Sequence, residues 1–321
     1  FVSPFLLFIL FTKPLLANPD ISARREIFLL HTKPLTLAPE CKDNLENFVS
    51  RLAAMTPGFS GADIANVCNE SALIAARNER KQVHARDFEA AIERVIGGLE
   101  KKKKVLSKDE KVTVAYHEAG HAVTAWFLEH ASPLLKVSIV PRGSSALGYA
   151  QYLPRDQFLQ TTDQLLDKMS VALGGRVAEA LVFGKITTGA QDDLDKVTRS
   201  AYGQVLDYGM SKQVGHLSFG QFNKGGFSPR PYSDKTAEVA DTEARSLVEK
   251  AYARTEEILL KYRDGLEQVA QLLLKNEVIN QEQVKEILGE RPFASPNDKA
   301  EQYYKSFSLS EPVDPDTTQK E

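Results

Sequence analysis

The sequence predicts a mainly α-helical protein with a small β element, and three observations lead to this expectation. Apolar residues recur at three- and four-residue spacing through most of the chain. The clearest alternation of apolar and polar residues is short and lies at residues 135–141. The composition is globular, with 42% hydrophobic and 26% charged residues among 321. That length suggests about two domains of ~100–200 residues each.

Residues 1–17 form an apolar leader of unknown role. The leader is shorter than the ~20 residues that span a bilayer, and Pro4, Lys13 and Pro14 interrupt it. It also lacks the basic leading region of a signal peptide. One interpretation is a membrane or targeting segment, and the other is an ill-fitting leader without stable structure.

Residues 18–99 are predicted to form a bundle of four short helices, at 21–30, 45–55, 63–78 and 85–95. The second helix ends at the breaker Thr56-Pro57-Gly58, and Gly97-Gly98 closes the fourth. The lysine-rich residues 100–106 then form a basic linker. We interpret this charge run as solvated, with phosphate binding as the alternative.

Residues 107–293 form the second predicted domain, which is also mostly helical. Its expected helices cover 112–130, 162–183, 192–210, 233–274 and 280–288, and its clearest strand is 135–141, with 148–153 as a candidate partner strand. Residues 294–321 are polar and interrupted by proline, so we expect a disordered tail.

Charge and cysteine content exclude two classes of protein. Forty basic and 43 acidic residues give a formal net charge of −3, whereas a nucleic-acid-binding protein would show a strong basic excess. The two cysteines, Cys41 and Cys68, match no thiolate metal motif and are too few for a disulfide-built secreted scaffold. We expect semi-buried thiols in a reducing compartment.

The segment His117-Glu118-Ala119-Gly120-His121 carries the strongest functional signal. On a helix, histidines four residues apart lie on one face and can share a tetrahedral cation. Glu118 cannot reach the same ligand position, but it is placed to take a proton from a water on the metal. This order of residues is typical of zinc peptidases. The alternative is a helix that carries two surface histidines by chance.

A catalytic zinc site normally has three protein ligands, so a third must come from elsewhere in the chain. None of the other histidines has the spacing of the extended zinc-peptidase pattern. A carboxylate is the better candidate, and Asp192 and Asp193 lie at the predicted start of a helix. Acidic residues also favour a first turn because of the helix dipole, and the local pattern leaves both interpretations open.

Three blocks in the same order resemble the FtsH family of ATP-dependent membrane proteases. They are TPGFSGADIANVCNESALIAAR at 56–77, VAYHEAGHAV at 114–123 and TTGAQDDL at 187–194. Two further matches, ERVIGGLEK at 93–101 and LGYAQYLP at 147–154, resemble the mitochondrial m-AAA subunits of the AFG3-like and paraplegin group. The resemblance covers about residues 18–293. It implies an AAA helical lid at 18–99 and a zinc metallopeptidase domain at 107–293.

The resemblance also implies roles for single residues. His117 and His121 would bind zinc, Glu118 would be the general base, and the third ligand would be Asp193 rather than Asp192. Glu179, in a matching Gly-Gly-Arg-x-Ala-Glu segment, would hydrogen-bond the far nitrogen of a zinc-binding histidine; a surface glutamate is the alternative.

Two further expectations concern substrate and nucleotide. Residues 136–140 would be an edge strand to which an extended substrate adds, with a plain core strand as the alternative. In the lid, His31, Gly61 and Ala62 match positions that lie against ATP in related motors. Family membership would further imply a hexamer of m-AAA subunits at the mitochondrial inner membrane, acting on unfolded or membrane proteins.

The sequence departs from the family in one large respect. A motor requires the phosphate-binding segment G-x-x-x-x-G-K-[ST], and these residues contain none. We therefore expect a chain that enters the family just before the lid, without a P-loop ATPase core and with weak ATP binding at most. The favoured hypothesis is a zinc endopeptidase, and the alternative is a non-catalytic or interfering subunit of a hexameric m-AAA complex.

Overall fold

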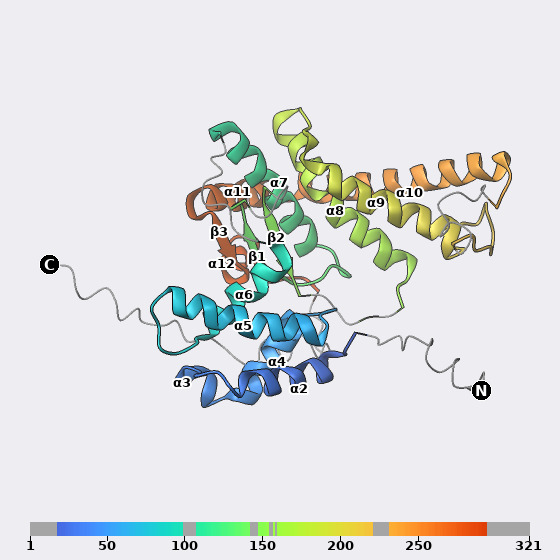
Figure 1. The fold of residues 1–321 in the computed structure, drawn as a ribbon. Coiled ribbons are helices and arrows are strands. Elements are labelled where there is room, and N and C mark those ends of the chain that lie inside the picture. Colours follow the sequence, from blue (N-terminus) through green and yellow to red (C-terminus); the bar gives the residue numbers. More distant parts are fainter. Residues whose placement is uncertain are drawn as a thin grey trace, which may run out of the picture. The chain divides into compact units, whose positions relative to one another are not determined.

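The computed structural model describes residues 18–98, 107–141, 147–153, 157, 159–220 and 231–293. These residues form two compact units, one up to Val95 and the other from Ile96 onward (Figure 1). Helices dominate both units, and the second also holds a small sheet, so the predicted fold class is confirmed. The predicted leader, basic linker and tail lie outside the described residues.

The first unit is built from helices that start at side-chain caps. Its helices are α2 (Ile21–Thr32), α3 (Pro39–Lys42), α4 (Leu45–Met55), α5 (Gly61–Arg77) and α6 (Ala85–Gly97). Asp20 caps α2, and Ser60 and Asp63 form a reciprocal capping box that starts α5 at Gly61, two residues before the predicted start. The four predicted helices are therefore present. The additional helix α3 has only four residues, too few for apolar periodicity to reveal it.

The core of this unit lies between α2, α4, α5 and α6. Phe48 and Phe88 meet edge to face at 5.2 Å, and both are fully buried together with Phe28. Cys41 and Cys68 are free thiols, and both are buried rather than semi-buried as expected.

The second unit is organised around α7 (Lys108–Trp126), whose residues from Val114 to Trp126 are all buried. Around it pack α8 (Thr162–Phe183), α10 (Asp234–Lys261) and α11 (Arg263–Asn276), while α9 (Gln191–Tyr202) lies against α8 and α10, and α12 (Gln281–Leu288) against α11 (Figure 1). A helix buried on every side is typical of the interior of a domain and positions its side chains rigidly.

Three predicted helices differ in their bounds from the observed ones. α7 covers Lys108–Trp126 rather than 112–130, and α9 ends at Tyr202, where a π-helical turn over Gly203–Asp207 follows. The long helix expected at 233–274 breaks at Tyr262, whose ring stacks on Phe127 at 3.5 Å. The break thus coincides with a tertiary contact that local periodicity does not signal.

The sheet has the order β2-β1-β3, with both pairs antiparallel. The strands are β1 (Leu134–Ser138), β2 (Tyr149–Tyr152) and β3 (Val278–Asn280). The predicted pairing of the first two is confirmed, but the prediction that residues 136–140 form an edge is wrong. Lys136, Val137 and Ser138 each pair on both sides, because β3 arrives from a distant part of the chain and covers the second edge of β1.

No helix among the described residues combines the length and apolar character needed to cross a membrane.

Candidate metal centre

α7 places His117, Glu118 and His121 inside the second unit. A capping box between Ser107 and Glu110 starts the helix ten residues before His117, so the motif lies well within regular helix. The two imidazoles project from one face of the helix, one turn apart. His117, Glu118 and His121 are each about nine-tenths buried.

α8 approaches α7 closely because both helices carry glycine where they cross. A Cβ atom at Gly120 would lie 2.3 Å from the carbonyl oxygen of Gly174, and one at Gly175 would lie 2.3 Å from Nε2 of His117. The absence of side chains at these positions lets the backbone of α8 lie directly against the motif. The crossing thereby brings Val171 and Glu179 of α8 beside the two histidines.

Each histidine is held by its Nδ1 atom. His121 Nδ1 lies 2.7 Å from the carbonyl oxygen of Val171, which only accepts, so Nδ1 carries the hydrogen. His117 Nδ1 donates in the same way to Oε1 of Glu179 at 2.7 Å. Glu179 in turn accepts from the backbone N–H of Thr187 at 2.7 Å. Both rings are thus fixed with Nε2 turned toward the same space, as in histidines that bind metals.

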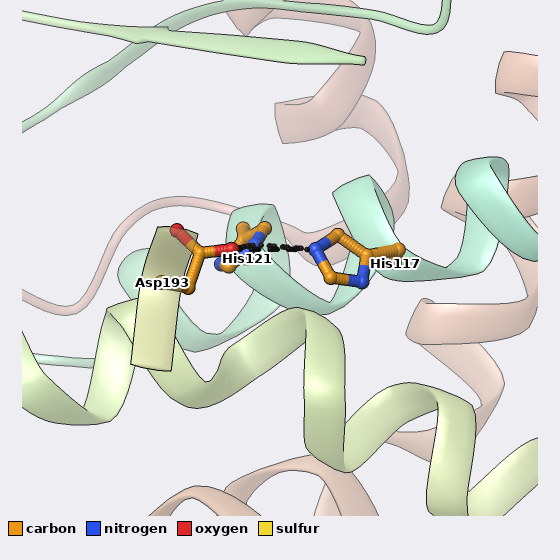
Figure 2. Close-up of side chains that lie close together, drawn as sticks. All are labelled: His117, His121 and Asp193. Carbon is orange, nitrogen blue, oxygen red and sulfur yellow. Dashed lines mark hydrogen bonds and ion pairs between the residues drawn. The ribbon is translucent and has the colours of Figure 1, made fainter. Parts of the chain in front are cut away.

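Asp193, in the first turn of α9, completes the cluster. Its Oδ2 lies 3.4 Å from Nε2 of His117 and 3.3 Å from Nε2 of His121, and the two Nε2 atoms are 3.1 Å apart. Figure 2 shows the three side chains pointing toward one another from α7 and α9. Asp192 does not join them, since its side chain is 78% exposed and pairs with Lys196 at 2.7 Å.

The electrostatics of this cluster indicate a place for a cation. Burial alone would lower the pKa of His117, but the contacts with Asp193 and Glu179 outweigh burial and raise that pKa to about 9. Burial would raise the pKa of Asp193, yet the hydrogen bonds from both histidines hold it below its ordinary value. Positive charge is therefore favoured where the two Nε2 atoms and Oδ2 of Asp193 come together. A divalent cation can replace the proton at that position.

These donor atoms suit zinc. Two imidazole nitrogens and one carboxylate oxygen match the three-ligand sets of catalytic zinc sites, which keep a further position open. All three atoms lie within 4.8 Å of one another, which is a workable span for ligands around one ion.

Glu118 lies beside the cluster but outside it. Its side chain packs against Gly148, just before β2, so closely that a Cβ atom there would lie 2.3 Å from Oε1. Burial raises the pKa of Glu118, and the neighbouring histidines only partly oppose that effect. A carboxylate in such a dry position is well suited to accept a proton and return it.

The three residues expected near nucleotide lie in the first unit. Gly61 is the first residue of α5 and packs beside Ile27 of α2 at ordinary contact distance, while Ala62 follows it in the first turn. His31 is in the last turn of α2 and is half-buried. The structure brings the start of α5 against α2, but no described contact joins His31 to Gly61 or Ala62.

Several residues of the site have no signal in the local sequence. Lys196 lies 3.2 Å from Oδ1 of Asp193, and Gly148 and Gly175 provide space for the side chains of Glu118 and His117. Gly148 and Gly175 can be recognised as part of the site only from their position in space. Lys196 has one local signal, its three-residue spacing from Asp193 on the same face of α9.

Two family models match the chain. The model described as "Peptidase family M41" matches residues 104–287, and the "AAA+ lid domain" model matches residues 47–90. Curated relatives include "ATP-dependent zinc metalloprotease FTSH 3, mitochondrial" from Oryza sativa subsp. japonica, 56% identical over 86% of this chain and 34% of the relative. "Mitochondrial inner membrane m-AAA protease component AFG3L1" from Mus musculus is 61% identical over 76% of this chain and 31% of the relative.

A third relative, "Mitochondrial inner membrane m-AAA protease component YTA10" from Saccharomyces cerevisiae, is 51% identical over 92% of this chain and 39% of the relative. The chain therefore spans about a third of the length of the curated relatives that it matches.

Proposed function

Because the chain belongs to peptidase family M41, we propose that it is a zinc-dependent endopeptidase whose metal is held by His117, His121 and Asp193. The expected likeness to FtsH-type and m-AAA proteases is confirmed. The observation that carries the proposal is the convergence of three donor atoms from α7 and α9, beside a buried carboxylate that takes no part in the cluster.

Each residue has a distinct task in this proposal. Zinc, when bound, supplies a water with a pKa lowered to ~7 and polarises the scissile carbonyl. Glu118 takes the proton from the attacking water and passes it to the departing amine nitrogen. Glu179 fixes the orientation of His117 through Nδ1, and the Val171 carbonyl does the same for His121.

We further propose that an extended substrate adds to β2 rather than to β1. Among the described strands, β2 pairs with β1 alone and is the end strand of the sheet, where the backbone of a peptide can add. The residue that precedes β2, Gly148, touches Glu118, so a peptide on this edge lies beside the base. Because such pairing uses the backbone of the substrate, it depends little on the substrate's side chains. This suits a protease that degrades unfolded or membrane proteins of many sequences.

The wider context follows from the relatives. We propose that residues 18–99 are an AAA lid, that residues 107–293 are the peptidase domain, and that the protein assembles with m-AAA subunits in a hexamer. The relatives named as mitochondrial inner membrane components support assembly and that location. Binding of ATP near His31, Gly61 and Ala62 is a weaker proposal, supported only by the lid match and the placement of Gly61 at a helix start.

The proposed activity is tested with Glu118→Gln. We expect zinc-loaded wild type to cleave casein and the variant to keep its zinc while cleavage falls about 10²–10⁴-fold, the usual contribution of a general base. Glu129→Gln is the matched control, because Glu129 is exposed and follows the end of α7. Equal cleavage by wild type and Glu118→Gln, or none by either, would refute the endopeptidase proposal. Co-purification with m-AAA subunits in the latter case would favour a non-catalytic assembly role.

A further inference from the structure

The hydroxyl of Tyr152 is buried and has no hydrogen-bond partner among the described residues. A buried hydroxyl without a partner costs about 1–3 kcal/mol, and such groups are rare in folded proteins. A phenylalanine at this position would place the same ring there without this cost, yet the chain has a tyrosine. The atom therefore calls for a role outside the resting structure.

Tyr152 ends β2 and lies on the face of that strand that is turned toward α7. Gly148, just before β2, and Ala150 and Tyr152 within it are alternate positions that share one face, and Gly148 touches Glu118. The Tyr152 ring packs against a cluster that includes Ala125, one turn beyond His121 on α7. The strand thus runs along the motif helix, with the tyrosine on the same side as the base.

The carboxylates near the metal centre also act on this hydroxyl. Burial raises the pKa of Tyr152, and the carboxylates of Glu118 and Asp193 raise it in addition. These two carboxylates come from different helices and meet only at the metal centre. Both carboxylates act on the hydroxyl, which remains protonated and able to donate at neutral pH.

We propose that Tyr152 is a further catalytic residue whose hydroxyl donates a hydrogen bond to the carbonyl oxygen of the scissile peptide. This inference rests on the proposed endopeptidase activity. During attack, the water oxygen bonds to the carbonyl carbon, the water proton moves to Glu118, and the carbonyl π pair moves to the oxygen. The Tyr152 hydroxyl stabilises that charge and keeps its own proton. The C–N bond then breaks as Glu118 returns the proton to nitrogen.

An unpartnered donor is well suited to this task. A hydroxyl already bonded to a protein acceptor would have to exchange partners during the reaction, whereas this one is available when charge develops. A peptide paired with the edge of β2 also lies next to Tyr152. An interaction that forms mainly in the transition state raises kcat and leaves KM nearly unchanged.

The test is Tyr152→Phe in the zinc-loaded full chain. We expect kcat for peptide cleavage to fall about 100-fold, as for the loss of one such donor, while KM and zinc content stay within about twofold of wild type. The thermal midpoint should not fall, because the variant removes a polar atom that bonds to none of the described residues. Tyr202→Phe is the matched control: its hydroxyl bonds Asp241 at 2.8 Å on an exposed part of α9, and activity should not change.

A peptide phosphonamidate separates this role from an indirect effect on Glu118. The inhibitor carries a tetrahedral anionic group in place of the scissile carbonyl, so Tyr152→Phe should weaken its binding by the same factor as kcat/KM. Unchanged kcat, or reduced kcat with unchanged inhibitor affinity, would overturn the assignment of Tyr152 while the endopeptidase activity stands. Absence of zinc-dependent cleavage by the wild type would overturn both.

Discussion

Gly175→Ala should remove zinc binding without unfolding the peptidase unit. Gly175 lies on α8 at the point where that helix passes His117, and an added Cβ atom would lie 2.3 Å from Nε2 and 2.4 Å from Cδ2 and Cε1 of the ring. Cβ atoms rarely approach other atoms within 3.4 Å. The atoms in the way belong to one side chain, so the imidazole rather than the backbone moves.

The displacement can be estimated from these distances. To reach 3.4 Å, Nε2 must move by about 1.1 Å, and zinc–ligand distances tolerate only about ±0.2 Å. The shift also breaks the 2.7 Å hydrogen bond to Glu179, and loss of such an outer contact alone weakens metal binding about 10–100-fold. We therefore expect the zinc affinity to fall at least about 100-fold. Overpacking should cost the metal-free unit about 1–3 kcal/mol.

Competition with a chromogenic zinc chelator measures the affinity, and thermal unfolding with and without zinc measures the coupled stability. Wild type should gain thermal stability on adding zinc, and Gly175→Ala should gain almost none while its metal-free midpoint falls by no more than about 10 °C. Gly203→Ala is the control, since its Cβ would meet Tyr208 at an ordinary 3.6 Å. Retained zinc affinity in Gly175→Ala would refute the placement of His117 against α8.

Three further predictions test other parts of the structure. Glu179→Gln should weaken zinc binding about 10–100-fold while the fold is retained, whereas Glu257→Gln, at an exposed position, should leave zinc binding unchanged. Equal zinc affinities of the two variants in a chelator competition would contradict the role of Glu179. Gly174→Ala places Cβ 2.6 Å from the backbone oxygen of Gly120, so the free energy of unfolding in urea should fall by about 3 kcal/mol or more; an unchanged value would exclude the close helix crossing. Burial raises the pKa of Cys41 and of Cys68 to about 12, so alkylation of the native protein at pH 8 should be slower than that of an exposed thiol by on the order of 10³. Because the unfolded thiols ionise near pH 9 and the folded ones do not, stability should fall as pH rises above about 9, and fast native-state alkylation would contradict this.

Local spacing was sufficient for the part of the site that lies on one helix. The four-residue interval between His117 and His121 fixes their common face wherever α7 is helical, and Glu118 follows from the same geometry. Helix starts were predicted less accurately, since α5 and α7 begin two and four residues before the expected positions, at the capping boxes of Ser60 with Asp63 and of Ser107 with Glu110.

Contacts between distant segments account for what the local pattern could not predict. Asp192 and Asp193 are equivalent as first-turn acids, and only the packing of α9 against α8 turns one toward the histidines and the other toward solvent. The edge of the sheet was wrongly assigned because Val137 pairs with Ile279, and no feature near Val137 signals that partner. The break at Tyr262 likewise depends on Phe127 of another segment.

The comparison of Asp193→Ala with Asp192→Ala tests the three-ligand metal centre most directly. Zinc content per chain should be measured after equilibration with a chelator that buffers free zinc at a level that saturates the wild type. We predict one zinc per chain in wild type and in Asp192→Ala, and little or none in Asp193→Ala, because only Asp193 reaches both Nε2 atoms. Equal zinc content in the two variants would contradict the proposed centre.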